Sequence, residues 1–169
     1  MDRILLDDEM LALALDVAKA RSIENISSGR SKEKLDRLME AHRVGALGEL
    51  AVSVFFGLPW EGKYYEGDAW KERGNDVEGL EVRATFRYNG NLVMKEDDVS
   101  RFPETPYIFC KLSKVSGGIL AKFAGWIYAK EAPDLWEEAS GGYENFYIVR
   151  THRLHKMKDL PLNKNKEAI

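Results

Sequence analysis

The chain has 169 residues, 44% of them hydrophobic, and a net charge of −3, so we expect one domain over 1–169 and exclude a protein that coats nucleic acid indiscriminately. The single cysteine, Cys110, excludes a disulfide framework and favours a reducing, cytoplasmic setting. The first residues are acidic and no apolar run approaches the roughly 20 residues of a membrane span, so we expect neither a signal peptide nor membrane association.

The first part of the chain predicts two helices followed by a loop. The N-terminal segment, residues 1–30, contains an amphipathic helix over 7–20, which the Asn25-Ile-Ser-Ser-Gly29 run ends. Ser31 is expected to cap a long helix that continues to Phe56, before Gly57 and Pro59 stop it. Residues 60–74 read as a polar, aromatic loop. Loops of that length are often functional, so Lys71 and Arg73 are candidates to line a substrate groove.

The second part predicts a sheet. Apolar and polar residues alternate over 80–88, which indicates a strand with Glu81, Arg83 and Arg87 on one face. Asn89-Gly90 predicts a hairpin that returns residues 91–95 antiparallel to that strand. The remaining expected elements are a turn or helix at 97–101, strands over 107–112, 119–129 and 145–149, and helices over 133–139 and 152–160. The fold class is therefore α/β or α+β, with helices before and after a mixed sheet.

Glu49 is the only charged residue in the apolar segment VGALGELAVSVFFGL, residues 44–58. A helix that is apolar on every side is a buried helix. Burying an unpaired carboxylate is costly, so Glu49 is expected to be protonated, paired from elsewhere in the fold, or bound to a metal. The alternative is that Glu49 lies at the helix edge and reaches Arg43 or water.

The segment GNDVEGLEVR, residues 74–83, predicts a tight turn that gathers charge. Glu78-Gly79 lies between two apolar residues and reads as a two-residue turn, which would place Asp76 opposite Glu81 on the face that Arg83 shares. Two carboxylates about 5 Å apart repel by roughly 3 kcal/mol at an effective dielectric of 20. The compensating charge is either Arg83, in a surface ion cluster, or a divalent metal.

The order Glu49, then Asp76, then Glu81-Val-Arg83 resembles the active-site series of the PD-(D/E)XK nuclease superfamily, over about residues 40–130. The resemblance implies a restriction-endonuclease-like fold, a mixed central sheet flanked by helices. It further implies that Asp76, Glu81 and Glu49 bind Mg²⁺ or Mn²⁺ and that these residues and Arg83 hydrolyse phosphodiester bonds. Arg43, six residues before Glu49, is similar to the pattern in Holliday-junction-resolvase-like members.

Arg83 stands where the family has lysine. Arginine stays protonated and cannot act as a base. The role that remains open to Arg83 is to stabilise negative charge on a phosphate. The first hypothesis is therefore a metal-dependent nuclease acting on DNA, or on RNA or branched DNA. The second is a catalytically inactive nucleic-acid-binding or assembly module with the same fold. A third class, a protein-binding scaffold with a surface ion cluster, predicts neither metal nor nucleic-acid binding.

Four basic residues are candidate contacts to nucleic acid: Arg43, Arg87, Lys71 and Arg73. DNA is expected as the partner in preference to RNA. A homodimer fits the resemblance, because such nucleases often dimerise to cut both strands. The C-terminal segment 150–169 is rich in lysine and arginine. It is read either as a further phosphate contact or as a solvated terminal helix with a frayed tail.

Overall fold

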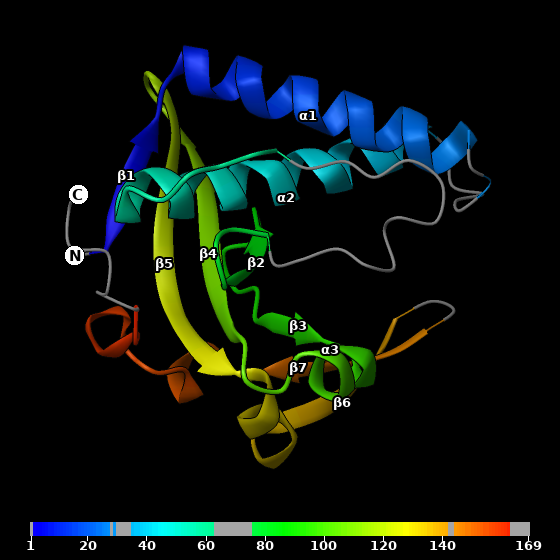
Figure 1. The fold of residues 1–169 in the computed structure, drawn as a ribbon, viewed down its shortest axis with the longest axis vertical. Helices are drawn as coiled ribbons and strands as arrows, with labels where there is room; N and C mark the ends of the chain where they lie inside the picture. Colours follow the sequence, from blue (N-terminus) through cyan, green and yellow to red (C-terminus); the bar gives the residue numbers. More distant parts are fainter. Residues whose placement is uncertain (1, 28, 30–34, 63–75, 142–143, 163–169) are drawn as a thin grey trace.

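The computed structural model describes residues 2–27, 29, 35–62, 76–141 and 144–162 (Figure 1). These form a mixed α+β structure with two sheets. The helices are α1 (Asp8–Ser27), α2 (Leu35–Phe56) and the short α3 (Glu96–Arg101). The strands are β1 (Arg3–Leu6), β2 (Glu81–Thr85), β3 (Leu92–Met94), β4 (Pro106–Val115), β5 (Gly118–Tyr128), β6 (Trp136–Gly141) and β7 (Glu144–Val149). Turns of 3₁₀ helix span Ala129–Asp134, Thr151–Arg153 and Met157–Asp159.

The main sheet has the strand order β1-β5-β4-β2. Its edge strand β2 runs parallel to β4, and the other neighbours are antiparallel. Helix α2 packs on one face, which we call the inner face, with α1 alongside it (Figure 1). The contact is close at Gly48, where an added Cβ would lie 2.6 Å from the Cβ of Ala84 and 3.2 Å from a methyl carbon of Val82. Gly48 therefore lets α2 approach β2 and carry Glu49 to the sheet edge.

The small sheet has the order β3-β7-β6 and covers one end of the opposite, outer face of the main sheet. Alternation along β4 directs Ile108 and Cys110 to the inner core, while Tyr107 and Phe109 join the cluster under the small sheet. The main sheet is consequently buried on both faces near the start of β4. Within the described residues, no helix is long and apolar enough to cross a membrane.

Several expected elements are confirmed. Helix α1 occupies the expected place but runs on to Ser27, past the predicted break, and α2 ends at Phe56 as predicted. The proposed cap at Ser31 lies outside the described residues. Strands β4, β5 and β7 match the expected strands with small differences at their ends, and α3 lies where a turn or helix was expected at 97–101. Strand β1 was not predicted.

Three expectations for the second part of the chain are wrong. Residues 91–95 do not return beside β2, because β3 pairs with β7 in the other sheet. The turn there closes from Gly90 N to Arg87 O at 3.0 Å, so Asn89-Gly90 does not occupy the two central positions that a hairpin needs. Residues 136–141 form β6 instead of continuing a helix, and residues 152–160 form two 3₁₀ turns separated by extended residues. Residues 136–141 pair with the adjacent strand β7, and His155 pairs with Trp126 of β5, so strand pairing overrides the local helical pattern in both cases.

Candidate functional site

The turn predicted at Glu78-Gly79 is confirmed. Val77 and Leu80 pair as an antiparallel bridge, with N···O distances of 3.1 and 2.7 Å, and Gly79 has a φ of +83° that favours glycine. The turn brings Asp76 to the start of β2, where its Oδ2 accepts a hydrogen bond from the Val82 backbone N–H at 3.0 Å. This bond fixes the Asp76 carboxylate at the sheet edge.

Glu49 is buried, with 4% of its surface exposed, and an arginine from α1 pairs with it. Both terminal nitrogens of Arg21 donate to the carboxylate, at 2.7 and 2.8 Å, and the Trp60 indole N–H donates at 3.1 Å. Of the three states expected for a buried Glu49, which were protonation, pairing with a distant residue and metal binding, the structure shows pairing with a distant residue. The alternative of a helix-edge Glu49 reaching Arg43 is wrong, because Arg43 pairs with Glu40.

The charge environment of Glu49 is unfavourable to its ionised form. Burial raises the pKa of Glu49, the hydrogen bonds and charge of Arg21 oppose that rise, and the negative charge of Asp76 adds to it, so the net shift is upward. Because the Asp76 charge contributes to the raised pKa of Glu49, the Asp76 carboxylate lies within electrostatic range of Glu49.

Glu81 and Arg83 share the outer face of β2, as the alternation predicts. Glu81 is fully buried, and its Oε2 lies 3.7 Å from Arg83 Nη1. Arg83 Nη2 donates to Asp98 Oδ1 of α3 at 2.9 Å, and its guanidinium lies 5.2 Å from the centre of the Tyr107 ring. With 30% of its side chain exposed, Arg83 links the buried Glu81 to the surface.

Arg83 is held as a fixed cation. Burial alone would lower the pKa of Arg83, but the charges of Asp98, Asp76 and Glu81 outweigh burial and raise it. Burial, together with the charges of Asp98 and Glu81, raises the pKa of Tyr107 well above its ordinary value. The charge of Asp76 therefore acts on both Glu49 and Arg83. Arg83, Glu81, Asp98 and Asp76 form a charged cluster at the β2 edge, whereas Glu49 lies on α2 at the inner face.

Two partners of the predicted residues were not predicted: Arg21, which pairs with Glu49, and Asp98, which pairs with Arg83. Arg21 follows Ala14 and Ala18 at helical spacing, and both alanines are buried, so the face of α1 that packs on α2 was visible in the sequence. Its partner was not, because the pair spans 28 residues. Asp98 lies in the first turn of a six-residue helix with no buried residue, and no sequence signal indicates its contact.

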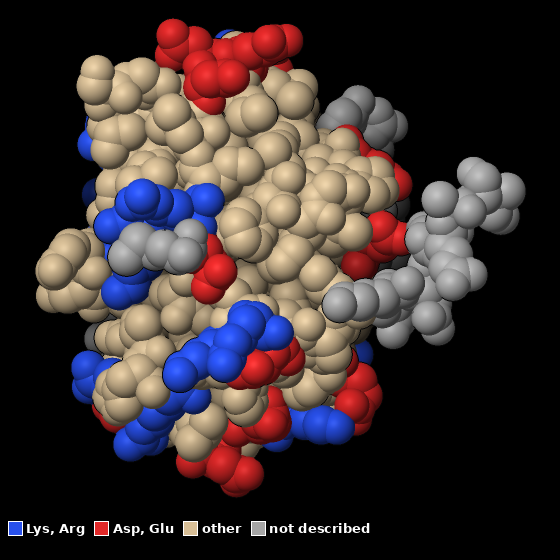
Figure 2. Space-filling view, turned by 90° about the vertical axis from the view of Figure 1, so that its left-hand side faces the viewer, with Lys and Arg blue, Asp and Glu red and all other residues tan. Residues whose placement is uncertain are grey.

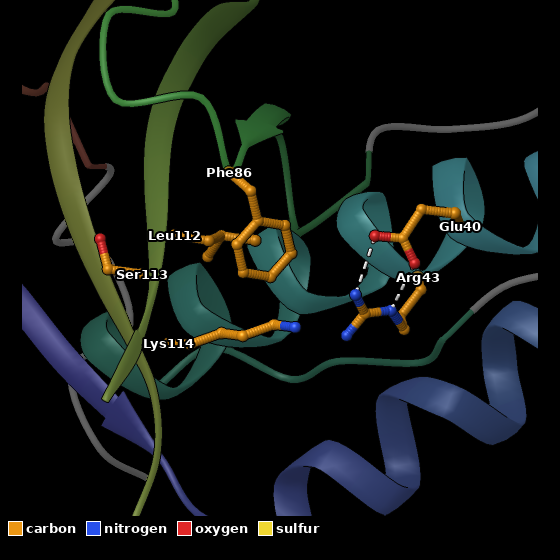
Figure 3. Close-up of a pocket in the computed structure, with 6 residues that line it drawn as sticks. All are labelled: Glu40, Arg43, Phe86, Leu112, Ser113 and Lys114. Atoms are coloured by element: carbon orange, nitrogen blue, oxygen red, sulfur yellow. Dashed lines mark hydrogen bonds and ion pairs between the residues drawn. The ribbon is translucent and has the colours of Figure 1, made fainter. Parts of the chain in front are cut away.

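Of the four residues predicted to bind nucleic acid, the structure describes Arg43 and Arg87. Arg43 lines an open pocket of about 390 Å³ on the inner-face side, where its side chain, Phe86 and Lys114 point toward one another (Figure 3). Its guanidinium donates twice to Glu40, both at 2.8 Å, and lies 5.4 Å from the Phe86 ring centre. Arg87 is exposed in the turn after β2. Lys71 and Arg73 lie outside the described residues.

The donor chemistry at the β2 edge suits a hard divalent cation, but with two ligands instead of three. Within the described part of the chain, no group of three or more histidine, cysteine, aspartate or glutamate side chains is arranged to hold a metal ion. The Glu49 oxygens accept hydrogen bonds from Arg21 and Trp60, and Asp98 pairs with Arg83 at 2.9 Å. Asp76 and Glu81 are the remaining predicted ligands beside Arg83. Mg²⁺ commonly uses one or two protein carboxylates together with water and substrate phosphates.

Comparison with protein-family models, with curated proteins and with solved structures finds no match to this chain.

Proposed function

We propose that this protein is a Mg²⁺-dependent nuclease with a restriction-endonuclease-like fold, acting on DNA in preference to RNA. The observation that supports the proposal is the geometry of the β2 edge, where Asp76 accepts a hydrogen bond from the Val82 N–H at 3.0 Å and Glu81 lies 3.7 Å from Arg83. The order Glu49, Asp76, Glu81 and Arg83 along the chain is the order that the family resemblance implies. Phosphodiester hydrolysis is proposed because the carboxylates of Asp76 and Glu81 attract a cation and the guanidinium of Arg83 attracts a phosphate.

In this proposal Asp76 and Glu81 hold the ion. Bound Mg²⁺ supplies an activated water and neutralises charge on the phosphate. Arg83 contacts a phosphate oxygen from its partly exposed position and stabilises the charge that develops there, since it remains protonated throughout. Glu49 acts as the accessory acid, and Arg21 and Trp60 orient it by hydrogen bonds to both oxygens.

The second candidate is a catalytically inactive nucleic-acid-binding or assembly module. The observation that favours it is that arginines already lie against the acidic groups: Arg21 on Glu49, and Arg83 on Asp98 and Glu81. In this reading the ion pairs stabilise a nuclease-like fold, and Arg83 has replaced a catalytic lysine without retaining cleavage.

The experiment that separates the candidates is cleavage of labelled single-stranded, double-stranded and branched DNA, and of RNA, with Mg²⁺ or Mn²⁺ and with EDTA. Asp76→Asn and Glu81→Gln preserve side-chain shape and remove the charge, and circular dichroism checks their folding. Asp16→Asn is the matched control, because Asp16 is an exposed carboxylate on α1. The proposal predicts metal-dependent cleavage that both site variants lose and the control keeps. Binding without cleavage by the wild type would support the inactive module.

A further inference from the structure

Three cations lie directly opposite one another across three adjacent strands of the main sheet. The register pairs Arg3 of β1 with Lys122 of β5, and Lys122 with Lys111 of β4. Directly paired residues share a face of a sheet, and like charges at such positions destabilise it. We call these three residues the cationic row. Its arrangement costs stability, which folding of the sheet alone does not explain.

The cationic row lies on the outer face at the end that the small sheet leaves open. Arg3 and Lys122 are exposed, and neither forms an ion pair with any residue that the structure describes. The Lys111 ammonium donates to the Tyr88 carbonyl at 3.1 Å, a contact that leaves its charge uncompensated. Seen from the side of β1 and β5, the molecule shows lysine and arginine side chains gathered at mid-height (Figure 2).

Asp2 directly precedes Arg3, but the strand positions two residues from the row on the same face carry no carboxylate. The positions two residues away on the same face include Leu5, Leu120 and Ser113, and Leu5 is 47% exposed. Neighbouring strands lie about 4.8 Å apart, so the row spans roughly 10 Å from Arg3 to Lys111. A single anion would meet only part of that length. A chain of phosphates would meet all of it.

The row also leads to the candidate site. Thr85 of β2 pairs with Lys111 and continues the row to the sheet edge. Arg83 lies two residues before Thr85 on the same face, about 6.6 Å along the strand. A phosphate backbone lying on the cationic row therefore reaches the partly exposed Arg83, beside the buried Glu81, without leaving the outer face.

We propose that the cationic row binds the phosphate backbone of a nucleic acid and directs it to the cluster at the β2 edge. This inference rests on the proposed function for the identity of the polyanion. It does not require the carboxylates, so it is tested separately from cleavage.

The test is fluorescence anisotropy of a labelled DNA strand of about 16 nucleotides, and of its duplex, in EDTA and from about 50 to 200 mM salt. Three phosphate contacts predict a slope of log K against log salt near −2 for the strand, or about −2.7 for the duplex. Replacing Arg3, Lys111 or Lys122 by glutamine should reduce the magnitude of that slope by about 0.7 to 0.9 each. Lys19→Gln, an exposed lysine on α1, is the matched control and should leave the slope unchanged.

The result that overturns the inference is an unchanged slope in the Arg3→Gln, Lys111→Gln, Lys122→Gln triple variant whose circular dichroism matches the wild type. Row-dependent binding to vesicles containing phosphatidylserine, with no DNA binding, would overturn it as well and indicate a membrane surface. If the row variants lose DNA binding while no metal-dependent cleavage occurs, the inference stands and the proposed nuclease function fails. If cleavage depends on Asp76 and Glu81 while the slope is unaffected, only this inference fails.

Discussion

Breaking the pair between Arg21 and Glu49 should destabilise the protein strongly, and removing both charges together should not. The pair is buried, with side-chain exposures of 17% for Arg21 and 6% for Glu49, and is bidentate at 2.7 and 2.8 Å. Removing one partner of such a pair leaves a buried charge and costs about 3–5 kcal/mol. We therefore expect about that loss in the free energy of unfolding for Arg21→Met, which leaves the Glu49 carboxylate without its cation. Glu49→Gln should cost less, because the raised pKa of Glu49 means that its neutral form is easier to bury. Glutamine retains an acceptor for the Trp60 N–H, so that hydrogen bond is preserved.

The double variant Arg21→Met, Glu49→Gln tests the coupling. Because both charges disappear together, its loss should fall well below the sum of the two single losses, by about 2–5 kcal/mol. The assay is urea unfolding at about pH 7, followed by tryptophan fluorescence and circular dichroism, with the slopes of the transitions compared. Losses that add within about 0.5 kcal/mol would show that the two side chains are not coupled and would refute the account of Glu49 burial.

Four further predictions follow from the same contacts. The raised pKa of Glu49 means that its contribution to stability is fully present below its unfolded pKa and is lost as pH rises through the folded value, so Glu49→Gln should flatten the stability profile from about pH 4.5 upward in denaturant titrations. Burial lowers the pKa of His42, whose ring nitrogens lie 2.9 and 3.0 Å from Ser22 Oγ and Asn25 Nδ2. The contribution of His42 to the free energy of unfolding is therefore present above about pH 6.5 and is lost as pH falls through its pKa in the folded state. His42→Gln should reduce the drop in melting temperature that acid causes. Gly48→Ala should destabilise by about 1–3 kcal/mol through the clash with Ala84, measured by urea unfolding, and Ala84→Gly should recover part of that loss. Burial raises the pKa of Cys110 to about 12, so an aromatic disulfide reagent should react with native protein only as fast as it unfolds.

The local features of the site could be predicted from the sequence. The Glu78-Gly79 turn depends on one glycine with positive φ between two apolar residues, and Glu49 was expected to be buried because its own helix is apolar all round. Both signals lie within a few residues of the feature that they predict. The alternation that puts Glu81 and Arg83 on one face of β2 is equally local.

What depends on distant pairing could not be predicted. Arg21 reaches Glu49 across 28 residues, and Arg83 reaches Asp98 across 15. The strand after Asn89-Gly90 pairs with β7, more than 50 residues later in the chain. The cationic row is visible only once the register of β1, β5 and β4 is known, because Arg3, Lys122 and Lys111 are isolated residues in the sequence.

The central claim is that Asp76 and Glu81 hold a divalent metal beside Arg83. The most direct measurement is calorimetric titration of Mn²⁺ into the wild type, into Asp76→Asn and Glu81→Gln, and into the Asp16→Asn control. The account predicts saturable binding in the wild type and control that both site variants lose. Equal Mn²⁺ binding by the wild type and Glu81→Gln, or none by the wild type, would contradict it.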